Sequence, residues 1–117
     1  MLLSEFQAVR VLASGPSTLS RLASRLGLSP AALTSLARGL VERGWARSNP
    51  DPSDRRASLL RVTPRGRRAM LEARREYRAG LRELEQGLSS SERQELARGL
   101  SALRRALGPP PEARAKG

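Results

Sequence analysis

The chain has 117 residues, and its 22 basic and 11 acidic residues give a formal net charge of +11 at pH 7. It contains no cysteine and no histidine, so disulfides, Cys/His zinc sites and imidazole acid–base catalysis are excluded. The length suits one compact domain with an appended helical arm, and the charge favours a polyanionic partner such as nucleic acid. Because the sequence shows neither an apolar run of membrane-spanning length nor a signal-peptide pattern, a cytoplasmic location is expected.

The segment "LSEFQAVRVLAS" predicts a first helix, because its apolar residues recur at helical spacing. Ser4, followed three residues later by Gln7, matches a capping box at the start of this helix. The Gly-Pro dipeptide at 15–16 ends the helix, and the residues "STL" at 17–19 leave room for no more than one edge strand.

Two more short helices follow, joined by the tight turn "GLS", and together they predict a helix-turn-helix. The first begins at Ser20 and ends at Gly27, a residue suited to the left-handed position after a helix. The second begins at Ser29, an N-cap residue followed by a proline, and ends at Gly44. The apolar residues expected on its inner face are Leu33, Leu36, Ala37 and Leu40.

The stretch "WARSNPDPSDRRASLLRVT" predicts a β-hairpin, with strands at 45–48 and 57–63 and a tip marked by Asn-Pro and Asp-Pro turn signals. A β-hairpin directly after a helix-turn-helix is a wing. Arginine near the tip of a wing suits the negative potential of a minor groove, and Arg56 is the candidate. Asp54 is placed to orient the Arg56 side chain through a charge-assisted hydrogen bond. In a plainer interpretation the aspartates only shape the turn and the arginines are solvated, but the preceding helix-turn-helix favours a DNA contact.

Two longer helices are predicted behind the hairpin. Thr63 is an N-cap residue followed by a proline, and the helix that it starts reaches about Gln86. Ser89 and Glu92 form a capping box for the last helix. Four leucines recur along this helix at spacings typical of a seam that packs on a partner helix, namely Leu96, Leu100, Leu103 and Leu107.

These elements predict a mainly helical fold with a small β-hairpin. A winged helix-turn-helix DNA-binding domain is expected over 1–63, a helical dimerisation arm of two helices over 64–107 and a disordered tail over 108–117. The sequence shows no nucleophile–base pair, metal-ligand cluster or nucleotide-binding glycine motif, so neither an enzyme nor a bound cofactor or metal is expected. The Glu and Arg residues that alternate along 72–85 predict a solvated salt-bridge face.

Four segments of the sequence resemble the MarR family of winged-helix regulators: "FQAVRVLA", "TLSRLASRLGLSPAALTSLARGLVERGWA", "DPSDRRASLLRVTPRGR" and "LSSSERQELARGLSALRRAL". The resemblance extends from Leu3 to about Leu107, and its most specific part is the wing with "RVTPRG" behind it. It implies a bacterial or archaeal transcription factor, usually a homodimeric repressor. Such a regulator binds a pseudo-palindromic operator in double-stranded DNA and is often released by a small-molecule effector.

Carried over to this sequence, the resemblance implies that the helix from Ser29 to Gly44 enters the major groove and that Arg56, beside Asp54, enters the minor groove. Arg55 is the expected neighbour of a phosphate. The full set of predicted DNA-contacting residues is Ser29, Pro30, Ala31, Thr34, Ser35, Arg38, Asp54, Arg55 and Arg56. Within it, the expected base readers are Thr34, Ser35 and Arg38, and the expected apolar contacts to thymine methyl groups are Pro30 and Ala31.

The sequence departs from the family pattern in three respects. Relatives usually carry an additional helix before the position of Leu3, and that helix helps to form their dimer interface. Where relatives often have Arg or Lys in the recognition helix, this chain has Ser35 and Gly39, so modest sequence specificity is expected. The absence of Cys and His excludes sensing by thiol oxidation or by a histidine zinc site.

Two other functions remain open at the level of sequence. One is a winged-helix module that binds another protein through the leucine seam between Leu96 and Leu107. The other is a nonspecific nucleic-acid-binding protein, which the high charge and the few base readers favour.

Overall fold

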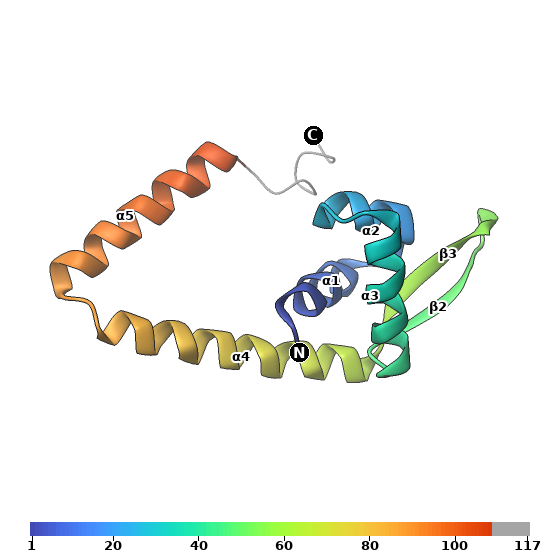
Figure 1. Cartoon of the computed structure of the whole chain (residues 1–117), viewed down its shortest axis with the longest axis horizontal. Helices are drawn as coiled ribbons and strands as arrows, with labels where there is room; N and C mark the ends of the chain where they lie inside the picture. Colours follow the sequence, from blue (N-terminus) through green and yellow to red (C-terminus); the bar gives the residue numbers. More distant parts are fainter. Residues whose placement is uncertain (109–117) are drawn as a thin grey trace. The chain divides into compact units, whose positions relative to one another are not determined.

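The computed structural model describes residues 1–108 and divides the chain into two compact units, Met1–Arg75 and the part that begins at Glu76 (Figure 1). The elements in chain order are α1 (Leu3–Ser14), β1 (Ser17–Thr18), α2 (Leu19–Leu26), α3 (Pro30–Glu42), β2 (Ala46–Asp51), β3 (Asp54–Val62), α4 (Pro64–Gln86) and α5 (Ser90–Leu107). The predicted fold class, mainly helical with a winged helix-turn-helix, is confirmed. Within residues 1–108, no helix has both the length and the apolar character needed to cross a bilayer.

Two helix starts differ from the prediction. Helix α1 begins at Leu3, and the carboxylate of Glu5 accepts the Leu2 N–H at 2.8 Å, so the predicted capping box of Ser4 and Gln7 is wrong. Helix α2 begins one residue before Ser20, because the Thr18 hydroxyl accepts the Arg21 N–H at 3.3 Å and caps the helix. In α1 the side chain accepts the N–H of the residue before the helix, whereas in α2 it accepts an N–H of the first turn.

Both helices of the helix-turn-helix end at a glycine in the left-handed conformation, Gly27 with φ 66° and Gly44 with φ 73°. After α3, the N–H of Trp45 donates to the carbonyl of Leu40 at 2.9 Å, which is the hydrogen bond of a Schellman turn. A β-carbon at such a φ is strained, so glycine fixes where each helix stops. The sequence therefore determines locally the turn between α2 and α3 and the start of the wing.

The core of the first unit is aliphatic and draws on every element before α4 except β1. Its fully buried larger side chains are Val9, Leu12, Leu22, Leu33, Leu40 and Leu60. Each such side chain contributes about 1.5–3 kcal/mol of hydrophobic stabilisation. The predicted inner face of α3 is confirmed for Leu33, Ala37 and Leu40, and Leu36 is partly buried against the same core. The opposite face of α3 is left in solvent.

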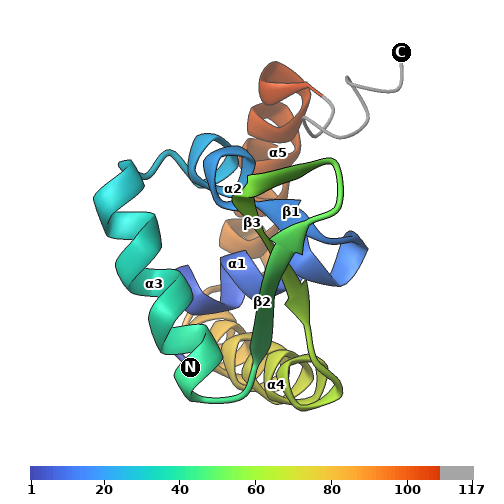
Figure 2. The same cartoon turned by 90° about the vertical axis from the view of Figure 1, so that its right-hand side faces the viewer.

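The three strands form an antiparallel sheet in the order β1-β3-β2, with β2 at one edge (Figure 2). Strands β2 and β3 are longer than predicted, and only Pro52 and Ser53 form the tip of the hairpin. Pro50, expected in the loop, lies inside β2. An edge strand tolerates a residue without an N–H, and the pairing shifts in register between Pro50 and Asp51.

The motif "RVTPRG" fastens the start of α4 to the base of the wing. The Thr63 hydroxyl donates to the Gly44 carbonyl at 2.6 Å and accepts the Gly66 N–H at 3.0 Å, which confirms Thr63 as the cap of α4. Its backbone N–H donates to the Trp45 carbonyl at 3.0 Å. A β-carbon added to Gly66 would clash with that same carbonyl oxygen, so the close approach requires glycine.

In the second unit, α5 starts at the predicted capping box, with the Ser89 N–H donating to the Glu92 carboxylate at 2.9 Å and the Glu92 N–H donating to the Ser89 hydroxyl oxygen at 3.1 Å. These hydrogen bonds lower the pKa of Glu92. No residue of α5 is buried, and its four leucines are 46–65% exposed. The predicted tail lies outside the described residues, apart from Gly108.

Candidate DNA-binding surface

Helix α3 presents an exposed outer face built from small and polar side chains. The Ser29 hydroxyl accepts the Ala32 N–H at 3.2 Å and caps the helix, with Pro30 at its first position. The Thr34 hydroxyl donates to the Pro30 carbonyl at 2.8 Å, so its oxygen is left only as an acceptor toward a ligand. The predicted contact residues of this region are all exposed, namely Ser29, Pro30, Ala31, Thr34, Ser35 and Arg38.

The wing lies beside α3 in both views of the molecule (Figures 1 and 2), and the other predicted contact residues are on it. Strand β3 begins directly after the hairpin tip with three exposed residues, Asp54, Arg55 and Arg56. The carboxylate of Asp54 accepts the backbone N–H of Arg56 at 3.0 Å. The prediction that Asp54 binds the Arg56 guanidinium is therefore wrong. Asp54 instead fixes the backbone from which the Arg56 side chain projects, as in an Asx turn, where a carboxylate accepts the N–H two residues further on.

Asp51 shapes the hairpin tip from the β2 side. Its carboxylate accepts the Ser53 N–H at 3.0 Å and the Ser53 hydroxyl at 2.8 Å. These two hydrogen bonds, followed by the positive charge of Arg21 on α2, hold the pKa of Asp51 below its usual value.

Two exposed arginines on the wing strands were missed by sequence reasoning. Arg47 of β2 and Arg61 of β3 lie directly opposite each other in the hairpin register. Like charges in such a cross-strand pair destabilise a sheet unless an anion lies between them. They can be recognised from the alternation of side chains along each strand. Ala46, next to Arg47, and Leu60, next to Arg61, are buried, whereas both arginines face outward.

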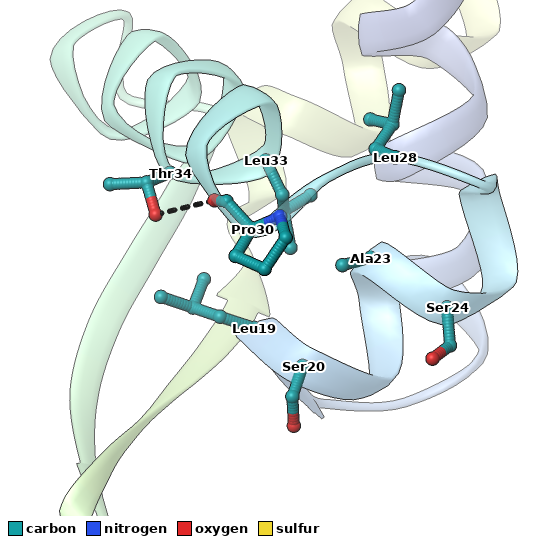
Figure 3. Close-up of a pocket in the computed structure, with 8 residues that line it drawn as sticks. All are labelled: Leu19, Ser20, Ala23, Ser24, Leu28, Pro30, Leu33 and Thr34. Atoms are coloured by element: carbon teal, nitrogen blue, oxygen red, sulfur yellow. Dashed lines mark hydrogen bonds between the residues drawn. The ribbon is translucent and has the colours of Figure 1, made fainter.

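A pocket of about 510 Å³ opens between α2 and the start of α3 (Figure 3). Its lining is Leu19, Ser20, Ala23, Ser24, Leu28, Pro30, Leu33 and Thr34. Most of these side chains are apolar or small, and Figure 3 shows Pro30 and Thr34, which are also predicted DNA contacts, on the α3 side of the opening. A ligand in this pocket and a DNA base edge would therefore meet the same two residues.

Residues 1–57 match the sequence profile of the MarR family. Among solved structures, RV1404 from Mycobacterium tuberculosis is 29% identical with a TM-score of 0.75, covering 94% of this chain and 76% of its own. MarR from E. coli in its apo form is 25% identical with a TM-score of 0.75, covering 85% and 74%. FabT from Streptococcus pneumoniae, solved in complex with DNA, is 23% identical with a TM-score of 0.68, covering 92% and 76%. A search among curated protein sequences found no relative.

The family match covers the helix-turn-helix and most of the wing, and the structural likeness extends over the remaining helices. Residues 1–57, which hold the helix-turn-helix and most of the wing, are those of a winged helix-turn-helix transcriptional regulator of the MarR family. Members of this family bind DNA and are not enzymes.

Proposed function

We propose that this protein is a homodimeric, sequence-specific transcriptional repressor that reads a pseudo-palindromic operator with α3 and the wing. The exposed, nearly uncharged outer face of α3 beside a basic wing is the observation that carries this proposal. Such a face leaves room for base edges, while the arginines around it neutralise phosphates. FabT, which shares the fold, was solved in complex with DNA, and this supports a DNA-binding role for the fold.

Within the major groove, we assign base contacts to Thr34, Ser35 and Arg38. Thr34 donates its hydroxyl proton to its own helix, so it accepts from an adenine or cytosine amino group. Arg38 has the fork geometry that suits guanine. Pro30 and Ala31 offer apolar surface to thymine methyl groups, and Ser29 completes the face. With one charged reader on the helix, specificity comes largely from groove shape, and A·T-rich flanks are favoured.

On the wing, Arg56 inserts into the minor groove next to each half-site, Asp54 fixes its backbone and Arg55 contacts a phosphate. The guanidinium of Arg56 is exposed, and the Asp54 hydrogen bond removes freedom from the backbone that carries it. Pre-ordering of this kind reduces the entropy lost on binding.

The helical arm behind the wing supplies the dimer contact. Residues 64–107 carry an exposed leucine seam, and two such seams bury each other across a two-fold axis. A two-fold dimer places its recognition helices about one helical turn of DNA apart, which matches a pseudo-palindromic operator. The boundary after residue 63 between a DNA-binding domain and a dimerisation arm is part of this proposal.

A small-molecule effector acts at the pocket between α2 and α3. A ligand that fills this cavity lies against Pro30 and Thr34, so it competes with DNA for the same side chains (Figure 3). The lining carries no charged side chain, so an uncharged, largely apolar molecule fits it best. Release of the operator by such a ligand is the expected regulation of the repressor.

The proposal is tested by anisotropy titration of a labelled duplex taken from DNA upstream of the coding sequence, against a duplex of scrambled sequence, at physiological salt. The wild type is expected to prefer the upstream duplex. Arg56→Ala is expected to weaken binding at least about tenfold, equivalent to roughly 1.4 kcal/mol. Arg98→Ala removes an equal charge from the exposed surface of α5 and is expected to change the affinity less than about twofold. Equal affinity of the wild type for both duplexes refutes sequence-specific repression.

A further inference from the structure

An ion pair between the buried Glu5 and the half-exposed Arg43 joins the first turn of α1 to the end of α3. Glu5 is only 4% exposed, although it is a charged residue. One carboxylate oxygen accepts the Leu2 N–H at 2.8 Å, and the other pairs with the guanidinium of Arg43. Both oxygens of the carboxylate therefore have a partner, and the pair ties together two helices that are far apart in sequence.

Arg43 stands at the junction of the recognition helix and the wing. It is the C-cap of α3, and its N–H donates to the Gly39 carbonyl at 3.1 Å. Its guanidinium carbon lies 5.1 Å from the centre of the Trp45 ring, within the range of a cation–π contact. One cation is thus held between a carboxylate of α1 and the aromatic ring that starts the wing.

Stability alone does not call for this arrangement. Burial strips the Glu5 carboxylate of its hydration, and an ion pair with an arginine that is half exposed to solvent offsets only part of that cost. A carboxylate in a DNA-binding unit also repels phosphates, which lowers affinity. The pair does fix an orientation. The Glu5 carboxylate and the Trp45 ring hold the guanidinium of Arg43 in place, and Arg43 in turn orients the end of α3.

We propose, on the basis of the function proposed above, that Glu5 is a positioning residue for DNA recognition. Through Arg43 and Trp45 it fixes the angle between α3 and the wing, so that α3 and Arg56 reach neighbouring grooves at the same time. Binding constellations tolerate displacements of only about 0.5 Å. Without Glu5, the leucines of α3 keep the helix in the core, but the contact that orients its last turn relative to the base of the wing is lost.

The test is Glu5→Gln, which keeps an oxygen for the Leu2 N–H and removes the charge that holds Arg43. Electrostatics alone predicts tighter DNA binding, because the protein loses a negative charge. The positioning role predicts the opposite sign, a loss of about tenfold in affinity, which lies within the coupling range of contacting residues. The matched control is Glu42→Gln, an equal charge change at the exposed neighbour of Arg43, for which unchanged or slightly tighter binding is expected.

Trp45 is the only tryptophan in the chain, so its fluorescence reports on the junction directly. Glu5→Gln is expected to shift its emission to the red as Arg43 leaves the ring, whereas Glu42→Gln leaves the emission unchanged. The double variant Glu5→Gln/Arg43→Gln is expected to bind DNA no more weakly than Glu5→Gln alone. Binding by Glu5→Gln that is as tight as that of Glu42→Gln overturns the inference.

A thermal melt shows whether Glu5→Gln folds. If it does not, Arg43→Gln tests the same contact, because Arg43 is half exposed and its replacement disturbs the core less. A positioning residue lowers the affinity while leaving the slope of log K against log salt at its wild-type value. A slope smaller by about one identifies Arg43 as a phosphate contact and overturns the inference. A wild type that fails to bind any duplex refutes the proposed function instead, so the two failures are distinct.

Discussion

Helices α3 and α5 both carry an apolar stripe, but only the stripe of α3 is buried. In α3 the stripe is buried, and Leu33 and Leu40 are at most 1% exposed. In α5 no residue is buried, and its leucines remain about half exposed. The comparison teaches that helical periodicity identifies an apolar face without saying whether the same chain covers it. The free faces then differ in kind: α3 offers a polar face for DNA, and α5 an apolar face that we assign to a second copy.

The largest effect is expected from breaking the α5 face. Leu103→Glu places a charge in the seam, so the proposed dimer should dissociate to the 12.7-kDa chain in light scattering. DNA affinity should fall by about 100-fold or more, because the two half-sites are no longer bound by linked subunits. Ser101→Glu, on the same exposed helix, is the control and should leave mass and affinity unchanged. A dimer that survives Leu103→Glu would show that the contact between subunits lies elsewhere.

A second large effect concerns the close packing of the first unit. Gly66→Ala should cost about 3 kcal/mol of unfolding free energy, since the methyl group meets the Trp45 carbonyl oxygen. Gly80→Ala, in the same helix but with open space around the added carbon, should raise the stability by up to about 1 kcal/mol. Urea denaturation measures both. Equal stability of the two variants would contradict the proposed role of the "RVTPRG" motif.

An intermediate effect is expected on the wing. Arg47→Ala should weaken binding to every duplex by a similar factor and reduce the salt slope by about one, because Arg47 and Arg61 are expected to face the phosphate backbone. Titrations at several salt concentrations, with operator and scrambled DNA, measure this. A loss confined to the operator duplex would instead make Arg47 a base reader.

The smallest effect is expected inside α3 itself. Gly39→Ala adds a methyl group into open space and removes a flexible residue from a helix interior, so stability should rise by about 1 kcal/mol. DNA affinity should change less than about twofold, as anisotropy titration can show. A strong loss of affinity would mean that DNA approaches the backbone at Gly39 closely enough to exclude a side chain.

Sequence reasoning worked where a feature is local. The starts of α3, α4 and α5 follow from Ser29, Thr63 and Ser89, because an N-cap and the first turn that it closes lie in the same few residues. It failed where the partner is distant in the chain. The extent of β2 around Pro50 depends on its being an edge strand, and the burial of Glu5 depends on Arg43, a residue that only the folded core brings close.

The candidate site divides in the same way. Helix periodicity predicted the exposed outer face of α3, and turn residues predicted the position of the wing. The partner of Asp54 was predicted wrongly, because a carboxylate two residues away reaches the backbone N–H before it reaches a long side chain. Arg47 and Arg61 became visible only once the hairpin register was fixed.

The most direct test is a hydroxyl-radical footprint of the wild type and of Arg56→Ala on DNA upstream of the coding sequence. The wild type should protect two symmetric half-sites about 10 base pairs apart, centre to centre, with further protection in the minor grooves that flank them. Arg56→Ala, at a concentration that restores occupancy, should lose the flanking protection and keep the centre. Identical footprints for the two proteins, or uniform protection along the whole duplex, would contradict recognition by α3 and the wing together.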